Sequence, residues 1–158
     1  MLDGFDSGNN MWVDANGMQM IPKTLNKRRE FAFSTSNTIA GNYYPVTSAI
    51  AIRDTNRTQG NFTEKQVTIL NDRSQGGSAG LRDRKNIELM QQRRGKKYDH
   101  YGVFEPLNDL DEWGRGVQVP ASYYMLIEDK ASPANQRQVQ KMLEQPLLFF
   151  YSHDFLIN

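Results

Sequence analysis

The 158-residue chain contains no cysteine and only two histidines, His100 and His153. The absence of cysteine excludes disulfides and thiolate metal ligands. The two histidines lie far apart and lack the His-Glu-x-x-His spacing of a zinc protease, whereas a catalytic zinc ion needs several converging ligands. The acidic cluster Asp109, Asp111 and Glu112 falls in a polar segment that we interpret as a solvated loop. We therefore expect neither a metal site nor a catalytic residue in this chain.

A strong charge of one sign and long apolar runs are also missing. The formal net charge is +1, which provides no long-range attraction for nucleic acid or for an anionic membrane. No run approaches the ~20 apolar residues that a membrane-spanning helix needs. Residues 82–97 do contain a local excess of positive charge, with two acidic residues, Asp83 and Glu88, against the basic residues Arg82, Arg84, Lys85, Arg93, Arg94, Lys96 and Lys97. We expect these cations to pair with another domain, and we expect neither nucleic acid nor a membrane as a partner.

Hydrophobic residues make up 38% of the chain, a fraction below that of most compact domains. A piece of a larger protein has such a composition, because its interfaces count as surface. Residues 1–10 are rich in Gly, Asn, Asp and Ser and lack a signal peptide's basic and apolar regions. We expect them to be a disordered or cut N-terminus, and residues 11–158 to form a single domain. Two sequons make Asn56 and Asn61 candidate glycosylation sites.

Hydrophobic alternation predicts several strands. Residues 12–20 are typical of a hairpin, because Asn16-Gly17 supports a tight turn. Residues 71–83, which include Gly76, Gly77 and Gly80, are typical of a long turn. Ser132-Pro133 and the spacing of Val139, Met142 and Leu143 predict a short helix over residues 133–145. Further strands are predicted at residues 44–52, 66–70, 86–92, 117–119, 123–127 and 147–151. Many strands without βαβ alternation indicate a mostly β fold, an antiparallel β-sandwich.

Five motifs, in order, resemble one known family. They are Asp14-Ala15-Asn16-Gly17, then Ala40-Gly41-Asn42-Tyr43-Tyr44-Pro45-Val46, then the string from Thr68 to Ser78, then Glu88-Leu89-Met90 with Arg93-Arg94, and finally Gly102-Val103 with Glu105-Pro106-Leu107. Together they resemble the C-terminal β-domain of lysosomal-type α-mannosidases, glycoside hydrolase family 38. The resemblance spans about residues 10 to 150.

The resemblance implies a parent enzyme that hydrolyses terminal α-mannosyl residues of N-glycans with retention of configuration. It implies a supersandwich fold of the galactose-mutarotase-like type that packs on an N-terminal catalytic domain. The zinc cofactor and the nucleophile of the family belong to that domain, so zinc is expected outside this chain. The implied setting is lysosomal, vacuolar or secreted.

In the family, an arginine of this β-region approaches the mannose-containing glycan. The resemblance therefore makes Arg93, Arg94, Asp99 and Tyr101 the candidate substrate-binding residues. Tyr98 and Tyr101 stand where the family has an aspartate and an arginine. If that arginine is the glycan contact, recognition of the substrate is altered or lost; the alternative is that the change is neutral. A stand-alone carbohydrate-binding module without an enzyme is the alternative reading of the sequence.

Overall fold

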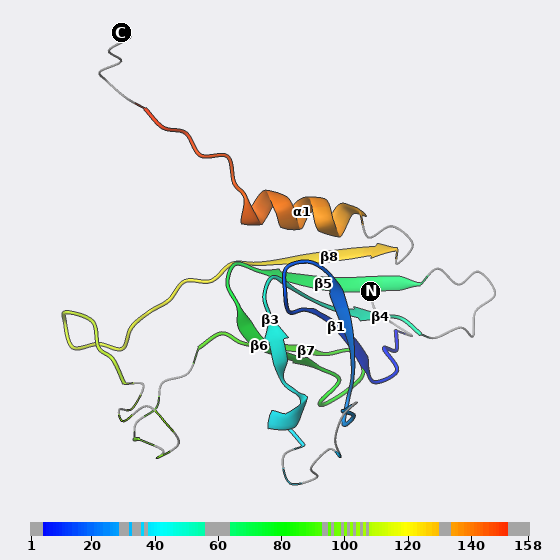
Figure 1. Ribbon diagram of the computed structural model, residues 1–158, viewed down its shortest axis with the longest axis horizontal. Helices are drawn as coiled ribbons and strands as arrows, with labels where there is room; N and C mark the ends of the chain where they lie inside the picture. Colours follow the sequence, from blue (N-terminus) through cyan, green and yellow to red (C-terminus); the bar gives the residue numbers. More distant parts are fainter. Residues whose placement is uncertain are drawn as a thin grey trace.

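The computed structural model describes residues 5–28, 32, 36, 38–55, 64–92, 95, 97–98, 100, 102, 104, 106, 108–129 and 134–151. Two antiparallel sheets form a sandwich, and a helix lies across its outside (Figure 1). The strands are β1 (Asn10–Asp14), β2 (Met20–Thr24), β3 (Tyr44–Val46), β4 (Ala49–Arg53), β5 (Lys65–Asn71), β6 (Gln75–Ala79), β7 (Ile87–Met90) and β8 (Tyr123–Asp129); the helix is α1 (Ala134–Glu144), and a 3-10 turn covers Ala40–Asn42. The mostly β fold with one short α-helix confirms the predicted antiparallel β-sandwich.

The larger sheet has the order β2-β1-β4-β5-β8, and the smaller sheet has the order β3-β6-β7. The core lies between the sheets. It contains Phe5, which precedes β1, and apolar side chains of both sheets, namely Met11, Val13, Tyr44, Val46, Ile50, Ile52, Val67 and Ala79. The described part of the chain contains no helix that is long and apolar enough to cross a membrane.

The expected disorder of the N-terminal residues 1–10 does not apply to residues 5–10. Phe5 is only 4% exposed and belongs to the core, and Ser7 is also buried. The Ser7 hydroxyl donates a hydrogen bond to the Arg84 carbonyl oxygen (2.7 Å). The small polar residues around Phe5 suggested disorder, but this single aromatic side chain anchors the segment.

The predicted hairpin is confirmed, although its connection is longer than a two-residue turn. Asp14 pairs with Met20, so residues 15–19 form the loop. Gly17 has a φ of +71°, while Asn16 does not adopt a positive φ. The Asn16 side chain instead closes the loop by accepting hydrogen bonds from the amides of Met18 (2.9 Å) and Gln19 (3.2 Å).

The predicted strand over residues 44–52 is two strands in different sheets. The chain leaves the smaller sheet after Val46 and enters the larger one at Ala49. The corner between them is held by the Thr47 amide, which donates to the Asp14 carbonyl oxygen (2.6 Å), and by the Asn71 amide, which donates to the Ser48 carbonyl oxygen (3.0 Å). Continuous alternation therefore concealed a change of sheet.

The predicted long turn over residues 71–83 contains a strand, β6, which pairs with both β3 and β7. Gly80 does adopt a positive φ, +79°, at the following turn. Gly77 serves a different purpose, because a Cβ atom there would lie 2.5 Å from Val46 Cγ2 and 3.2 Å from Leu89 Cδ2. The smaller sheet can approach the core this closely only because residue 77 has no side chain.

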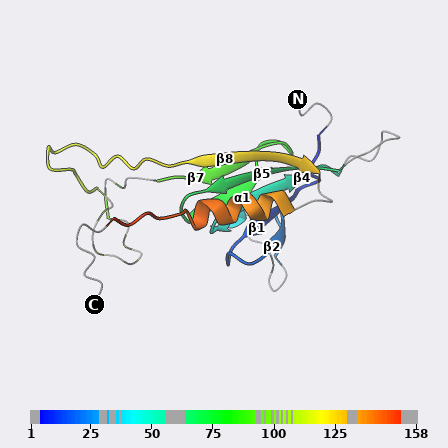
Figure 2. The same cartoon turned by 90° about the horizontal axis from the view of Figure 1, so that it is seen from above.

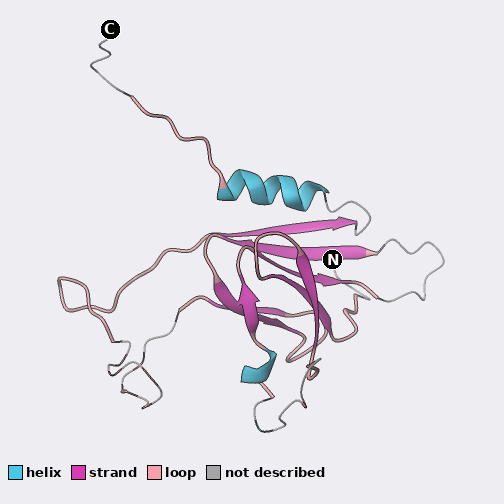
Figure 3. Cartoon of the chain, viewed as in Figure 1, coloured by secondary structure: helices cyan, strands magenta, loops and turns pink. Residues whose placement is uncertain are grey.

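Two other predicted strands are absent. Residues 117–119 form no strand; the carbonyl oxygens of Val117 and Val119 instead accept hydrogen bonds from the side chains of Gln92 (3.2 Å) and Gln91 (3.1 Å). Residues 147–151 leave α1 as an exposed loop segment (Figure 3). The prediction failed at both places because a β-prone sequence forms a strand only where a neighbouring strand supplies hydrogen bonds.

Helix α1 confirms the predicted helix, and two of the three predicted face residues, Val139 and Leu143, are half-buried, whereas Met142 is not. The helix packs on the face of the larger sheet that points away from the smaller sheet (Figure 2). We call this face the outer face. The buried side chains of α1 are Gln136 and Gln140, whereas Met142 is 66% exposed. The most deeply buried side chains of the helix are therefore polar, and the apolar Val139 and Leu143 beside them are half-buried.

Candidate functional site

The sequence-predicted site residues lie outside the described part of the structure. This applies to the substrate-binding candidates Arg93, Arg94, Asp99 and Tyr101 and to the glycosylation candidates Asn56 and Asn61. Next to them, the ring of Tyr98 lies 4.4 Å from that of His100 and 5.8 Å from that of Phe104, measured between centroids. The segment that departs from the family pattern thus carries a small cluster of aromatic rings, of which Phe104 is strongly exposed.

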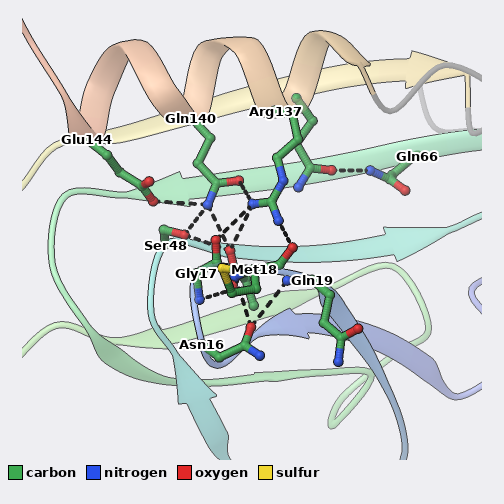
Figure 4. Close-up of polar contacts among 11 residues, drawn as sticks. Asn16, Gly17, Met18, Gln19, Ser48, Gln66, Arg137, Gln140 and Glu144 are labelled. Carbon is green, nitrogen blue, oxygen red and sulfur yellow. Dashed lines mark hydrogen bonds and ion pairs between the residues drawn. The ribbon is translucent and has the colours of Figure 1, made fainter.

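A buried polar network joins α1 to the outer face of the larger sheet (Figure 4). Its centre is Asp14 at the end of β1, whose side chain is completely buried. The Asp14 carboxylate accepts hydrogen bonds from the Gly17 amide (2.6 Å), from the Ser48 hydroxyl (2.9 Å) and from Gln140 Nε2 (2.8 Å). Each of these donors compensates part of the cost of burying a charge.

Arg137 supplies the positive charge for this network. Its Nη1 atom lies 3.6 Å from Asp14 Oδ2 and donates to Gln140 Oε1 (2.9 Å). The same guanidinium group donates to the carbonyl oxygen of Gly17 (3.3 Å) and to that of Met18. One arginine of α1 therefore fixes the tip of the β1–β2 loop while it neutralises the buried carboxylate (Figure 4).

A second polar node lies beside the first, at Gln66 on β5. Its Nε2 atom donates to Gln136 Oε1 (2.8 Å) and to Thr68 Oγ1 (2.9 Å), and its Oε1 atom accepts from Arg53 Nε (2.7 Å). The Arg53 guanidinium lies over the Trp12 ring, 4.2 Å from its centroid. Burial lowers the pKa of Arg53, but a guanidinium remains charged across the physiological range.

Glu128 stands opposite Gln66 in the register of β5 and β8. Burial raises the pKa of the Glu128 carboxyl above its ordinary value. Its Oε1 atom is buried and has no hydrogen-bond partner among the residues that the structure describes. The outer face therefore contains one carboxylate that is well compensated, Asp14, and one that is not.

The contacts of this network position the helix and the loop. Within the described ranges, no three His, Cys, Asp or Glu side chains gather as metal ligands would. The side chains in contact are mainly amides and hydroxyls, and the central carboxylate is engaged by its donors. The network holds α1 on the sheet and gives the β1–β2 loop a fixed shape.

Sequence reasoning missed this network, although two signals for it exist. Asp14 and Asn16 flank a turn, a position where short polar side chains often bond to nearby amides. On the helix, Gln136, Gln140 and Glu144 are spaced four residues apart and so lie on one face. The third component, Ser48, could not be found from local sequence, because it lies 34 residues from Asp14.

The surface of the described residues is rich in exposed apolar side chains. They include Phe104, Leu110, Trp113, Met125 and Ile127, together with the entire run Leu147, Leu148, Phe149, Phe150 and Tyr151. Scattered exposed apolar residues are ordinary, whereas large contiguous apolar patches are typical of protein interfaces, membrane contacts and ligand grooves.

Comparison with known proteins gives a consistent result. The sequence matches the Glycosyl hydrolases family 38 C-terminal domain over residues 4–101. It is 38% identical over 133 residues to "Lysosomal alpha-mannosidase" of Bos taurus, an alignment that covers 84% of this chain and 12% of that protein. It is 43% identical over 107 residues to the protein of the same name from Felis catus, with 66% of this chain and 10% of the relative covered. "Alpha-mannosidase" of Canavalia ensiformis is 26% identical over 153 residues, which cover 93% of this chain and 15% of that protein. The chain thus spans between 10% and 15% of the length of these relatives.

Proposed function

Because this chain belongs to the C-terminal domain of glycosyl hydrolase family 38, we propose that it is the β-domain segment of an α-mannosidase. The complete enzyme hydrolyses terminal α-mannosyl residues of N-glycans with retention of configuration. The observation that carries the proposal is the family match over residues 4–101, together with relatives that are named α-mannosidases. The names of the animal relatives favour a lysosomal location, and a vacuolar or secreted one is the alternative.

The segment contributes structure rather than catalytic groups. The described residues do not fit a zinc site, since no cluster of three candidate ligands exists among them. We propose that the zinc ion and the nucleophile of the enzyme lie in the N-terminal catalytic domain, outside this chain. The large exposed apolar side chains support a role in packing on that domain.

The glycan-contacting part of the segment is the stretch that follows β7. Arg93, Arg94, Asp99 and Tyr101 are the residues that we assign to the border of the glycan site. A guanidinium group suits this role because its planar arrangement of donors can engage two oxygen atoms at once. The aromatic cluster of Tyr98, His100 and Phe104 provides ring faces in the same stretch.

Two measurements on the complete polypeptide that contains this chain test the proposal. The first is hydrolysis of p-nitrophenyl α-mannoside and its loss on zinc chelation; a complete polypeptide that releases no p-nitrophenol under any zinc condition refutes the enzyme assignment. The second compares KM for a mannose-terminated N-glycan with KM for the aryl mannoside. Arg94→Met should raise the KM for the N-glycan by about tenfold, the loss expected for one charged hydrogen bond. The same substitution should leave the KM for the aryl mannoside unchanged.

Arg115→Met is the matched control for that substitution. Arg115 is an exposed arginine of the same chain whose partner is Asp111 (3.0 Å), so its loss should change neither KM. If Arg93→Met and Arg94→Met both behave like the control, the glycan-contact assignment is wrong even though the enzyme assignment stands.

A further inference from the structure

The two sheets of the sandwich differ in width, and the difference leaves one side of it open. The most extensive contacts between the sheets join β1 to β3 and β6, and β4 to β7. The smaller sheet therefore covers the β1–β4 half of the larger one. Among the described residues, the hydrogen bond between Gln75 of β6 and the Tyr123 hydroxyl joins the smaller sheet to β8 only at the start of that strand.

Two apolar side chains of β8 are exposed as a result. Met125 pairs with Ile69 and Ile127 pairs with Val67, so both stand on the core-facing side of the sheet. Met125 is nevertheless 64% exposed and Ile127 is 59% exposed. Apolar side chains on the core-facing side of a strand are expected to be covered, because alternation places the buried set there.

The free edges of the sandwich lie on this same side. Strand β7 is the last of the smaller sheet and β8 is the last of the larger one in the described part of the chain. A strand added next to β7 continues the order β3-β6-β7 and comes to lie over β5 and β8. The start of β8 is already joined to the smaller sheet, since the Tyr123 hydroxyl lies 2.9 Å from Gln75 Nε2.

We propose that this open side binds an extended apolar segment from the remainder of the same mannosidase polypeptide. The segment pairs with the free edge of β7 and covers Met125 and Ile127. Met125 and Ile127 stand two residues apart on β8, so an extended segment that covers them needs an apolar side chain at every second residue. The proposal rests on the proposed function, because relatives in which this chain spans 10% to 15% of the length have ample further polypeptide.

Three methionines of the chain serve as natural probes for this proposal. Met125, Met142 and Met18 are 64%, 66% and 75% exposed, so they should oxidise at similar rates if nothing covers them. The complete polypeptide is treated with hydrogen peroxide, folded and in urea, and the sulfoxide at each methionine is measured by peptide mass spectrometry. We expect Met125 to oxidise at least about tenfold more slowly in the folded protein than in urea.

Met142, on α1 at the opposite face of the larger sheet, serves as the internal reference. Equal oxidation of Met125 in the folded protein and in urea overturns the proposal. Protection of Met125 that disappears on dilution to a monomer, followed by light scattering, assigns the site to a second copy and also overturns it. If Leu148→Asp abolishes the protection of Met125, the segment that covers Met125 is the exposed run of residues 147–151. That result also overturns the proposal.

The readout separates this inference from the proposed function. Oxidation is measured without any activity assay, so a polypeptide with a protected Met125 that hydrolyses no mannoside refutes only the enzyme assignment. An active mannosidase in which Met125 oxidises freely refutes only the strand-binding inference.

Discussion

Replacing Gly77 with alanine should destabilise the sandwich, because the new methyl group has no space. Its Cβ atom would lie 2.5 Å from Val46 Cγ2, 3.2 Å from Leu89 Cδ2 and 3.3 Å from Ile50 Cδ1. Val46 is completely buried and β-branched, so it cannot rotate away at little cost. The smaller sheet must therefore move as a unit, away from the core.

The size of the effect follows from the packing. Inserting one methyl group into a tightly packed core typically costs about 1–3 kcal/mol. A chain of this size loses about 2–4 °C of Tm for each kcal/mol, so Gly77→Ala should lower Tm by about 2–12 °C. The neighbouring Gly76→Ala is the control, since its Cβ atom would make only ordinary contacts, the nearest at 3.6 Å from Met90 Sδ. Gly76→Ala should leave Tm unchanged or raise it slightly, because alanine restricts the unfolded chain.

Thermal and urea unfolding followed by circular dichroism measure both variants. A double-mutant cycle identifies the cause, because Val46→Ala removes the methyl group that blocks the new side chain. The double variant Val46→Ala, Gly77→Ala should be more stable than the sum of the single effects predicts, by about 0.5–3 kcal/mol. The reasoning is refuted if Gly77→Ala unfolds like Gly76→Ala, or if the two single effects are additive.

Two further substitutions test the outer face. Arg137→Met removes the cation beside Asp14 and the donors to the β1–β2 loop. It should lower the free energy of unfolding by about 1–3 kcal/mol and speed amide hydrogen exchange at Gly17. As the control, Arg115→Met removes an exposed ion pair and should lower the free energy of unfolding by less than about 1 kcal/mol. Glu128→Gln should raise Tm at pH 7, because burial raises the pKa of Glu128 and so penalises its charged form in the folded state. The gain in Tm should be complete above the pKa of Glu128 in the folded state and should vanish below the ordinary glutamate pKa near 4.5. A Tm difference between Glu128→Gln and the unaltered protein that is constant across a pH series contradicts the argument.

The strands that could be predicted from sequence are those whose own side chains make them β-prone. Residues 66–70 and 123–127 are rich in β-branched and aromatic side chains, and they form β5 and β8 at nearly the predicted bounds. Strand β6, by contrast, is Gln-Gly-Gly-Ser-Ala, a composition that by itself favours a turn. It is a strand because β3 and β7 pair with it on both sides, and because only glycine fits against Val46.

The polar network could be predicted from the sequence only in part, for a related reason. Apolar spacing on residues 133–145 selected Val139, Met142 and Leu143 as the buried face of the helix. Val139 and Leu143 are half-buried on that face, but the fully buried side chains are Gln136 and Gln140, because the sheet surface beneath the helix presents Asp14 and Gln66. A helix turns toward the groups that it can satisfy, and those groups come from strands distant in the sequence.

The exposed apolar residues show the same dependence of local structure on distant partners. The run of residues 147–151 has the composition of a strand but no paired neighbour among the described residues, and it stays exposed. Met125 and Ile127 do lie in a strand, but on a core-facing surface that the smaller sheet does not reach. A hydrophobic fraction of 38% is already low, and a self-sufficient domain would not leave this much of it in water. The exposure of Met125 and Ile127 follows if the side of the sandwich formed by β7 and β8 is completed by another part of a longer polypeptide.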